Sequence, residues 1–268
     1  MNKCINPDYP VHCRIMKYKI ENGSIDEIWN GSFSDYLHDI NIDASKKYCV
    51  VCEFSMYEEK NNSLRPSNVL VVDMVNKKHW IIPNFQVSAH SPFDPVEPDL
   101  IYFSNHNFRF VHTKIFKLLK NAIFSIDFKG PASVYKYRLT PNGPTEEGVF
   151  TEPDMFRMQN IHVFIHRNQK IIAGLAFPDH IFIANADSMK LMKKIKIFNR
   201  RADNHILAKK RCSIGTFSPS IDGEYLYVHT NKSFQIIDIE TENVRYCHTY
   251  FFNKICPNHM QTSKDIDW

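Results

Sequence analysis

Four histidines lie in or beside predicted strands of this sequence and are the residues best suited to hold a metal ion. They are His12, His90, His106 and His162, out of thirteen histidines in all. Neutral imidazole is a good ligand for iron, manganese and zinc, and an open coordination position leaves room for a substrate. No H-x-H or H-E-x-x-H pair fixes such ligands locally, so a metal site depends on the fold. For each histidine alone, a hydrogen-bonded place in the protein interior is the simpler interpretation.

Two further residues could act on a ligand held near these histidines. Arg157 precedes the predicted strand that contains His162. A guanidinium binds a carboxylate or a phosphate through two parallel hydrogen bonds, so Arg157 is a candidate anion-binding residue, with a structural salt bridge as the alternative. Tyr102 lies close to His106 in the sequence and could orient a ligand there, or fill space between strands.

Other kinds of site are disfavoured. The sequence has no G-x-S-x-G, G-x-G-x-x-G or P-loop motif and only 8 glycines, so we expect no nucleotide cofactor. Cys49 and Cys52 form a C-x-x-C pair inside the predicted strand "KYCVVCEF". Residues three apart on a strand point to opposite faces, which disfavours a shared zinc ion or a redox pair.

The elements that must position these residues are short β-strands, which the periodicity predicts almost throughout. Two groups, starting near residues 158 and 212, each hold four predicted strands separated by short turns. The segment "FSPSIDGEYLYVHTNKSFQIIDIETENVR" has the form of a β-propeller blade, with an S-P-x-x-D-G turn early and an I-D-I-E-T turn late. "VLVVDMVNKKHWII" repeats its second half, with Asp73 in the place of Asp238.

These units predict an all-β fold, a β-propeller of about five four-stranded blades in one domain spanning residues 1–268. We expect a half-blade at residues 11–31 and further blades starting near residues 47, 86, 158 and 212. One short helical insertion is predicted at residues 111–122, where Ile115, Leu118 and Leu119 have helical spacing. A β-sandwich is the alternative.

The stretch "AHSPFDPVEPDLIYFSNH", residues 89–106, resembles a segment of the oligogalacturonate lyases. In that family a ligand histidine precedes an F-x-P-x-D-P-x-L-I-x-F run that ends in "CHEG". The resemblance covers about twenty residues and the blade turn. It implies a propeller with a manganese ion held at the axis by histidines and a glutamine, and it puts His90 in the place of a metal ligand. "SNHN" replaces "CHEG" here, and the chain is too short for the family's full ring of blades. The metal-binding glutamine is also missing from its place after His90, although Gln159 lies near His162.

We therefore expect an enzyme with a histidine-held divalent metal (Fe, Mn or Zn) on the propeller axis, acting as a lyase, cyclase or isomerase on a small polar or anionic metabolite. The alternative is a non-catalytic propeller that binds a protein or a sugar.

The composition limits the partners and the compartment. The net charge is +4, and the basic stretch 190–211 has no aromatic stacking motif beside it, so we expect no nucleic-acid partner. No apolar leader or membrane span stands out, and the seven scattered cysteines favour the reducing cytoplasm over a disulfide framework. The sequence does not determine the oligomeric state.

Overall fold

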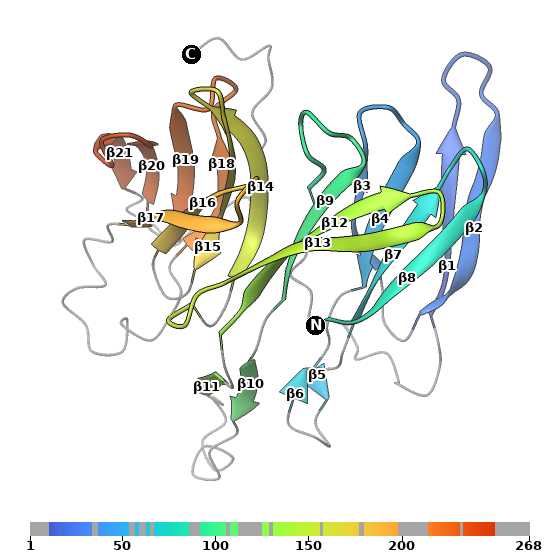
Figure 1. The fold of residues 1–268 in the computed structure, drawn as a ribbon, viewed down its shortest axis with the longest axis horizontal. Coiled ribbons are helices and arrows are strands. Elements are labelled where there is room, and N and C mark those ends of the chain that lie inside the picture. The colour runs from blue at the N-terminus through green and yellow to red at the C-terminus, as the bar shows by residue number, and fades with distance from the viewer. Residues whose placement is uncertain are drawn as a thin grey trace.

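In the residues that it describes, the computed structural model shows five antiparallel sheets that follow one another along the chain. Two small hairpins lie together beyond one edge of these sheets (Figure 1). The described residues are 11–33, 37–53, 57–58, 63–64, 67–85, 92–105, 108–111, 125–128, 131–155, 158–176, 180–197, 214–230 and 233–249. This part of the chain contains strands and turns, and no helix in it could cross a membrane.

Sheets 1 to 3 occupy the first half of the chain. Sheet 1 is the hairpin of β1 (Val11–Tyr18) and β2 (Ile25–Phe33). Sheet 2 has the order β3 (Leu37–Ile42), β4 (Tyr48–Glu53), β7 (Ser67–Asp73) and β8 (Lys78–Phe85). Sheet 3 has the order β9 (Leu100–Asn105), β12 (Ser133–Thr140) and β13 (Gly143–Thr151).

Sheets 4 and 5 each have four strands in sequence order. Sheet 4 holds β14 (Met158–His166), β15 (Gln169–Ala176), β16 (His180–Asn185) and β17 (Lys190–Lys196). Sheet 5 holds β18 (Ile214–Pro219), β19 (Tyr225–Thr230), β20 (Ser233–Asp238) and β21 (Val244–Thr249). The small hairpins are β5 (Tyr57–Glu58) with β6 (Ser63–Leu64), and β10 (Phe108–Val111) with β11 (Ser125–Phe128).

The described residues form four apolar core clusters, and each cluster lies between two successive sheets. Strand β4 shows why the sequence is apolar without a break there. Its Tyr48, Val50 and Cys52 face sheet 3, whereas Cys49 and Val51 face sheet 1, so both faces of the strand are buried. In the outer strand β13 only Gly143 and Phe150 are buried, and most of the other residues are exposed. An inner strand such as β4, which is covered on both faces, is therefore more hydrophobic than this outer strand.

The four-stranded groups predicted near residues 158 and 212 are confirmed as sheets 4 and 5. Asp73 and Asp238 also have the equivalent roles that the repeat predicted. Oδ1 of Asp73 accepts the N–H of Asn76 at 2.8 Å, and Oδ1 of Asp238 accepts the N–H of Thr241 at 2.9 Å, each closing the turn before the last strand of its sheet.

Two predictions about elements need correction. The second unit begins at residue 37 with β3, and not near residue 47. Strand β3 was not predicted because its sequence is short and contains several polar residues. Val111, the first residue of the predicted helix, belongs to strand β10, and residues 112–124 lie outside the described part.

Candidate functional site

The antiparallel order of the strands gives the array two different edges. In sheets 1, 2, 4 and 5 short turns join the first strand to the second and, where there are four strands, the third to the fourth; in sheet 3 a short turn joins β12 to β13. We call the side of these turns the tight-turn edge. The opposite side, the long-loop edge, carries the long connections 54–66, 106–132 and 198–213. The hairpins of the first two of these connections touch through β6 and β10, and Figure 1 shows them together beyond the sheets. Loops on a rigid scaffold are the usual places for binding and catalysis.

Three of the residues predicted from the sequence fall on connections at the long-loop edge. His90, His106 and Arg157 lie outside the described residues, so their side chains are not placed. Their described neighbours are Pro92, Asn105 and Met158. The oxygen of Pro92 accepts the N–H of Tyr102 at 3.1 Å, and Phe93 pairs with Ile101. Pro92 and Phe93 therefore lie beside β9.

One hydrogen bond joins sheets 3 and 4 at the long-loop edge. The hydroxyl of Ser104 donates to the backbone oxygen of Met158 at 2.8 Å, and both groups are buried. Beside it, Oδ1 of Asn105 accepts the N–H of Ser133 at 3.3 Å. The end of β9 and the start of β14 therefore lie together, which brings the positions that follow Asn105 and precede Met158 to the same place.

Strand β14 is irregular next to this junction. Its pairing with β15 shifts between Gln159 and His162, and Asn160 has a positive φ of 50°. A β-bulge of this kind bends a strand and re-aims its side chains, and bulges are frequent near active sites. The irregularity marks the start of β14 as the most unusual piece of backbone at this edge.

His162 and His12 are described, and the structure does not bring them together. The ring of His162 is half-buried and packs edge-on against Phe217 of sheet 5, with ring centres 4.8 Å apart. His12 is exposed on sheet 1, with Nδ1 3.4 Å from the hydroxyl of Ser32. Figure 1 shows β1 and β14 well apart. Since ligand nitrogens lie about 2.0–2.1 Å from a bound zinc ion, these two histidines cannot share one metal.

Within the described residues, no group of three or more His, Cys, Asp or Glu side chains is arranged to hold a metal ion. Cys49 and Cys52 point to opposite faces of β4, as their spacing predicted. Burial raises the pKa of the Cys49 thiol to about 12, so this residue is an inert core thiol.

Tyr102 lies at the other end of β9, toward the tight-turn edge. Its side chain is fully buried, and its hydroxyl donates to Oδ2 of Asp94 at 2.9 Å. Oδ1 of Asp94 accepts the N–H groups of Val96 and Glu97, both at 2.9 Å, so Asp94 shapes its turn. The hydroxyl of Tyr102 is thus hydrogen-bonded to Asp94 within the core. Its role in orienting a ligand near His106 stays a prediction.

Asp94 also belongs to an ion network that the sequence did not predict. Nζ of Lys170, at the start of β15, lies 2.9 Å from Asp94, 2.7 Å from Glu97 and 3.3 Å from Asp187. The side chains of Lys170 and Asp94 are 8% and 0% exposed. Burial lowers the pKa of Lys170, but the hydrogen bonds to Glu97 and Asp94 outweigh this effect and raise it above its usual value.

Arg138 extends the network toward solvent. Its guanidinium lies 3.0 Å from Glu97 and 2.9 Å from Asp99, and it also pairs with Glu147. Hydrogen bonds from Lys170 and Arg138 lower the pKa of Glu97 to about 2. The network therefore ties sheet 3 to sheet 4 at the tight-turn edge.

A pH dependence of stability follows from Glu97. Because the folded pKa of about 2 lies below the ordinary value of 4.5, the carboxylate stabilises the fold above pH 4.5, and this contribution is lost as the pH falls toward 2. We expect the stability difference between the wild type and Glu97→Gln to shrink over that interval, as measured by urea unfolding at several pH values. Glu21→Gln, in the exposed β1–β2 turn, is the control. A difference that stays constant down to pH 2 would contradict the assignment.

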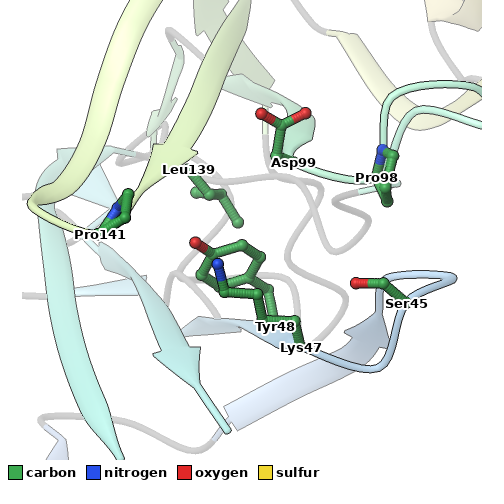
Figure 2. A pocket seen from close by; sticks show the side chains of 7 residues that line it. All are labelled: Ser45, Lys47, Tyr48, Pro98, Asp99, Leu139 and Pro141. Carbon is green, nitrogen blue, oxygen red and sulfur yellow. The ribbon is translucent and has the colours of Figure 1, made fainter. Parts of the chain in front are cut away.

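A small pocket opens at the same edge, between sheets 2 and 3 (Figure 2). Its volume is about 290 Å³, and its lining is Ser45, Lys47, Tyr48, Pro98, Asp99, Leu139 and Pro141. Nζ of Lys47 lies 4.7 Å from the centre of the Tyr48 ring, and the Tyr48 hydroxyl raises the pKa of Lys47. The lining holds one cation, Lys47, and one carboxylate, Asp99, so Lys47 is the described residue with which Arg157 can be compared as an anion-binding group.

The part of the basic stretch 190–211 that the structure describes makes intramolecular contacts. Lys194 pairs with Asp154 at 2.6 Å, and Nζ of Lys193 donates to the oxygen of Ile239 at 2.9 Å. Residues 198–211 of the stretch lie outside the described part. These two lysines therefore join neighbouring elements of the fold.

No known protein family and no curated protein matches this sequence. Solved structures with a similar fold include a functionally unknown protein from Desulfotomaculum acetoxidans, at 14% identity and a TM-score of 0.54. They also include an oligogalacturonate lyase from Vibrio parahaemolyticus, at 8% identity and a TM-score of 0.52. A chain of a mitotic checkpoint complex is similar at 9% identity and a TM-score of 0.50.

The alignments cover 87%, 87% and 90% of this chain but only 62%, 59% and 61% of those chains, so this chain spans about three fifths of their length. At such low identity the likeness concerns the fold alone. The protein has an all-β fold that is shared with, among others, an oligogalacturonate lyase.

Proposed function

We propose that the five sheets are blades of a β-propeller and that its long-loop edge binds a small polar or anionic metabolite with a divalent metal. The observation that carries this proposal is the Ser104–Met158 hydrogen bond, which joins sheets 3 and 4 at that edge. Consecutive Cα atoms are about 3.8 Å apart, so His106 and Arg157 lie within about 4 Å of Asn105 and Met158, and His90 within about 8 Å of Pro92. Three chemically suitable residues are thus confined to one region.

In this proposal His90 and His106 are the principal ligands of an iron, manganese or zinc ion. His162 is the candidate third ligand, because it follows the bulge in β14, whereas His12 lies on β1, far from β14. The metal would act as a Lewis acid that polarises a carbonyl or carboxylate. Arg157 would hold an anionic group of the substrate, which fits a lyase, cyclase or isomerase. The buried thiol of Cys49 supports the cytoplasm as the proposed location.

Metal analysis of the purified full-length protein tests the proposal. We expect about one equivalent of a divalent metal per chain, and its loss in both His90→Ala and His106→Ala. His79→Ala, a change at an exposed histidine of β8, should retain the metal. A protein that contains no metal, and that takes up no Mn²⁺, Fe²⁺ or Zn²⁺ in titration calorimetry, would refute a metal centre.

Anion binding can be located with two matched variants. Arg157→Met should abolish the binding of succinate or inorganic phosphate, measured by calorimetry, while Lys47→Met should leave it unchanged. The reverse result would place the anion in the pocket at the tight-turn edge and overturn the long-loop site.

The second candidate function is a non-catalytic binding platform. The contact between β6 and β10 favours it, because two hairpins from neighbouring sheets form one projecting surface. If the protein contains and binds no metal, the binding platform would be a better explanation of the long-loop edge than a metal-dependent enzyme.

A further inference from the structure

Three tight turns at the end of sheets 1 and 2 lie side by side. They are residues 17–26 of the β1–β2 hairpin, residues 43–47 between β3 and β4, and residues 73–78 between β7 and β8; we call them together the lysine tip. The N–H of Met74 donates to the oxygen of Lys47 at 2.8 Å, which joins the two turns of sheet 2. Figure 1 shows the hairpin turn at the upper right, where it projects beyond the neighbouring turns.

The lysine tip exposes large apolar side chains. Ile20, in the hairpin turn, is 85% exposed, and Val75, in the β7–β8 turn, is 68% exposed. Tyr18 and Ile25 pair across the end of the hairpin, and both are 61% exposed. Exposed apolar side chains that gather at one place are typical of a surface that binds a partner or a membrane.

Hydrogen bonds within the turn hold Ile20 in its exposed position. The N–H of Lys19 donates to the oxygen of Ser24, and the N–H of Gly23 donates to the oxygen of Lys19, both at 2.8 Å. Oδ1 of Asn22 also accepts the N–H of Ser24 at 3.0 Å. The backbone of the turn is therefore closed on itself, and Ile20 extends from its outer side.

The charges around these side chains are mainly positive. Lys19 forms an ion pair with Asp26 at 2.8 Å. The hydrogen bond from Lys19 lowers the pKa of Asp26, and the nearby charges of Lys77 and Lys17 lower it further. Three ammonium groups thus surround one carboxylate, which can neutralise only one of them. Lys77 also shows that the β7–β8 turn lies beside the hairpin.

The remaining acidic groups of the tip do not balance its lysines. Among the described residues, four exposed lysines of the tip form no direct ion pair: Lys17, Lys46, Lys77 and Lys78. Glu21 is an exposed carboxylate of the same turns. Asp43 and Asp73 are buried, and each accepts a backbone N–H of its own turn. The surface that a partner meets is therefore basic.

We propose that the lysine tip docks on an anionic phospholipid bilayer. Ile20 and Val75 would enter the boundary between headgroups and acyl chains, and Tyr18 would lie at the headgroup level, where tyrosine is enriched in membrane proteins. The lysines would face the negative headgroups, which are concentrated in the cytoplasmic leaflet. A nucleic acid would match the lysines but would leave Ile20 in water, so a lipid surface fits both features of the tip.

The lysine tip and the long-loop site lie on opposite edges of the sheets. The connections outside the described residues leave from the long-loop edge, as do residues 1–10 before β1 and residues 250–268 after β21. Docking through the tip would leave the long-loop edge facing solvent. The proposal therefore does not depend on a metal or on the proposed enzymatic function.

Co-sedimentation of the full-length protein with lipid vesicles tests the proposal. We expect binding to vesicles of phosphatidylcholine and phosphatidylserine, and much weaker binding to phosphatidylcholine alone. Ile20→Ser should weaken the binding about tenfold. Lys46→Gln/Lys77→Gln should weaken it about fivefold for each lysine removed, and Glu21→Lys should strengthen it by a similar factor.

Two control variants match these changes elsewhere on the protein. Ile221→Ser replaces another exposed isoleucine, in the β18–β19 turn, and Lys190→Gln/Lys196→Gln removes two exposed lysines of β17. Both should bind the anionic vesicles as the wild type does. Absence of binding to these vesicles would overturn the proposal. Binding that only the β17 variant weakens would assign the contact to the basic stretch 190–211 and would overturn it as well.

Insertion of the apolar side chains can be measured separately from the attraction of charges. In Ile20→Trp, vesicles that contain brominated phosphatidylcholine beside phosphatidylserine should quench the added tryptophan fluorescence. Ile221→Trp, the matched control, should show no added quenching. If the added tryptophan of Ile20→Trp is not quenched while the protein is bound, the hairpin turn does not enter the bilayer, and the proposal is wrong.

Discussion

Replacement of Lys170 with methionine is expected to lower the free energy of unfolding by about 3–5 kcal/mol, the effect of removing one member of a buried ion pair. Lys170 is the cation beside the fully buried carboxylate of Asp94, which also accepts the hydroxyl of Tyr102. Without the ammonium, this carboxylate would lose its buried cationic partner. The loss should be measured by urea unfolding at neutral pH, followed by circular dichroism.

A matched variant shows whether the loss of stability depends on the burial of the ion pair or only on the removal of a positive charge. Lys194→Met removes the cation of an exposed pair with Asp154, whose side chains are 28% and 68% exposed. Exposed pairs contribute at most about 1 kcal/mol, so this variant should unfold close to the wild type. Equal losses in the two lysine variants would show that the network around Lys170 does not support the junction of sheets 3 and 4.

The second large effect is expected at Gly223, in the turn between β18 and β19. Gly223 has a φ of 73°, and a Cβ there would collide with the backbone oxygen of Ile165 in sheet 4. Gly223→Ala should lower the free energy of unfolding by about 2–5 kcal/mol, as the sum of left-handed strain and overpacking. Urea unfolding of the purified variant provides the measurement.

Gly23→Ala is the control for the conformational part alone. Gly23 has a similar φ of 68°, but the nearest atom that its Cβ would meet is the hydroxyl of Tyr18 at 3.7 Å. We expect a loss of only about 1–2 kcal/mol. If the two alanine variants lost equal stability, the close approach of sheets 4 and 5 at Gly223 would not matter.

The sequence predicted the strands wherever local signals were strong. In sheets 4 and 5, apolar runs alternate with turns such as "SPSIDGE", in which Asp222 accepts the N–H of Glu224 and Gly223 takes up a positive φ. Strand β3 was missed because its sequence, "LHDINI", is short and polar at its start. Its place in sheet 2 depends on pairing with β4, which local propensity does not contain.

The candidate site, too, could be predicted from the sequence only in part, because its distances depend on how the sheets pack. Because strands alternate in direction, the sequence places His106 and Arg157 at one edge once the strand order is known, but it does not give their distances. Lys170 was overlooked because a lysine at the start of "KIIAGLAF" looks like an ordinary surface residue. Its partner Glu97 is 73 residues away in the sequence, and the two meet only because sheets 3 and 4 pack together.

The division of the core among four separate clusters has a consequence for how the protein opens. Among the described residues, each sheet shares apolar clusters with its predecessor and its successor, as the units of a repeat protein do, so their stability is close to a sum of nearest-neighbour terms. Sheets 1 and 5 contribute to one such cluster each, and sheets 2 to 4 to two. Thermal fraying should therefore start in sheets 1 and 5, and sheets 2 to 4 should open later.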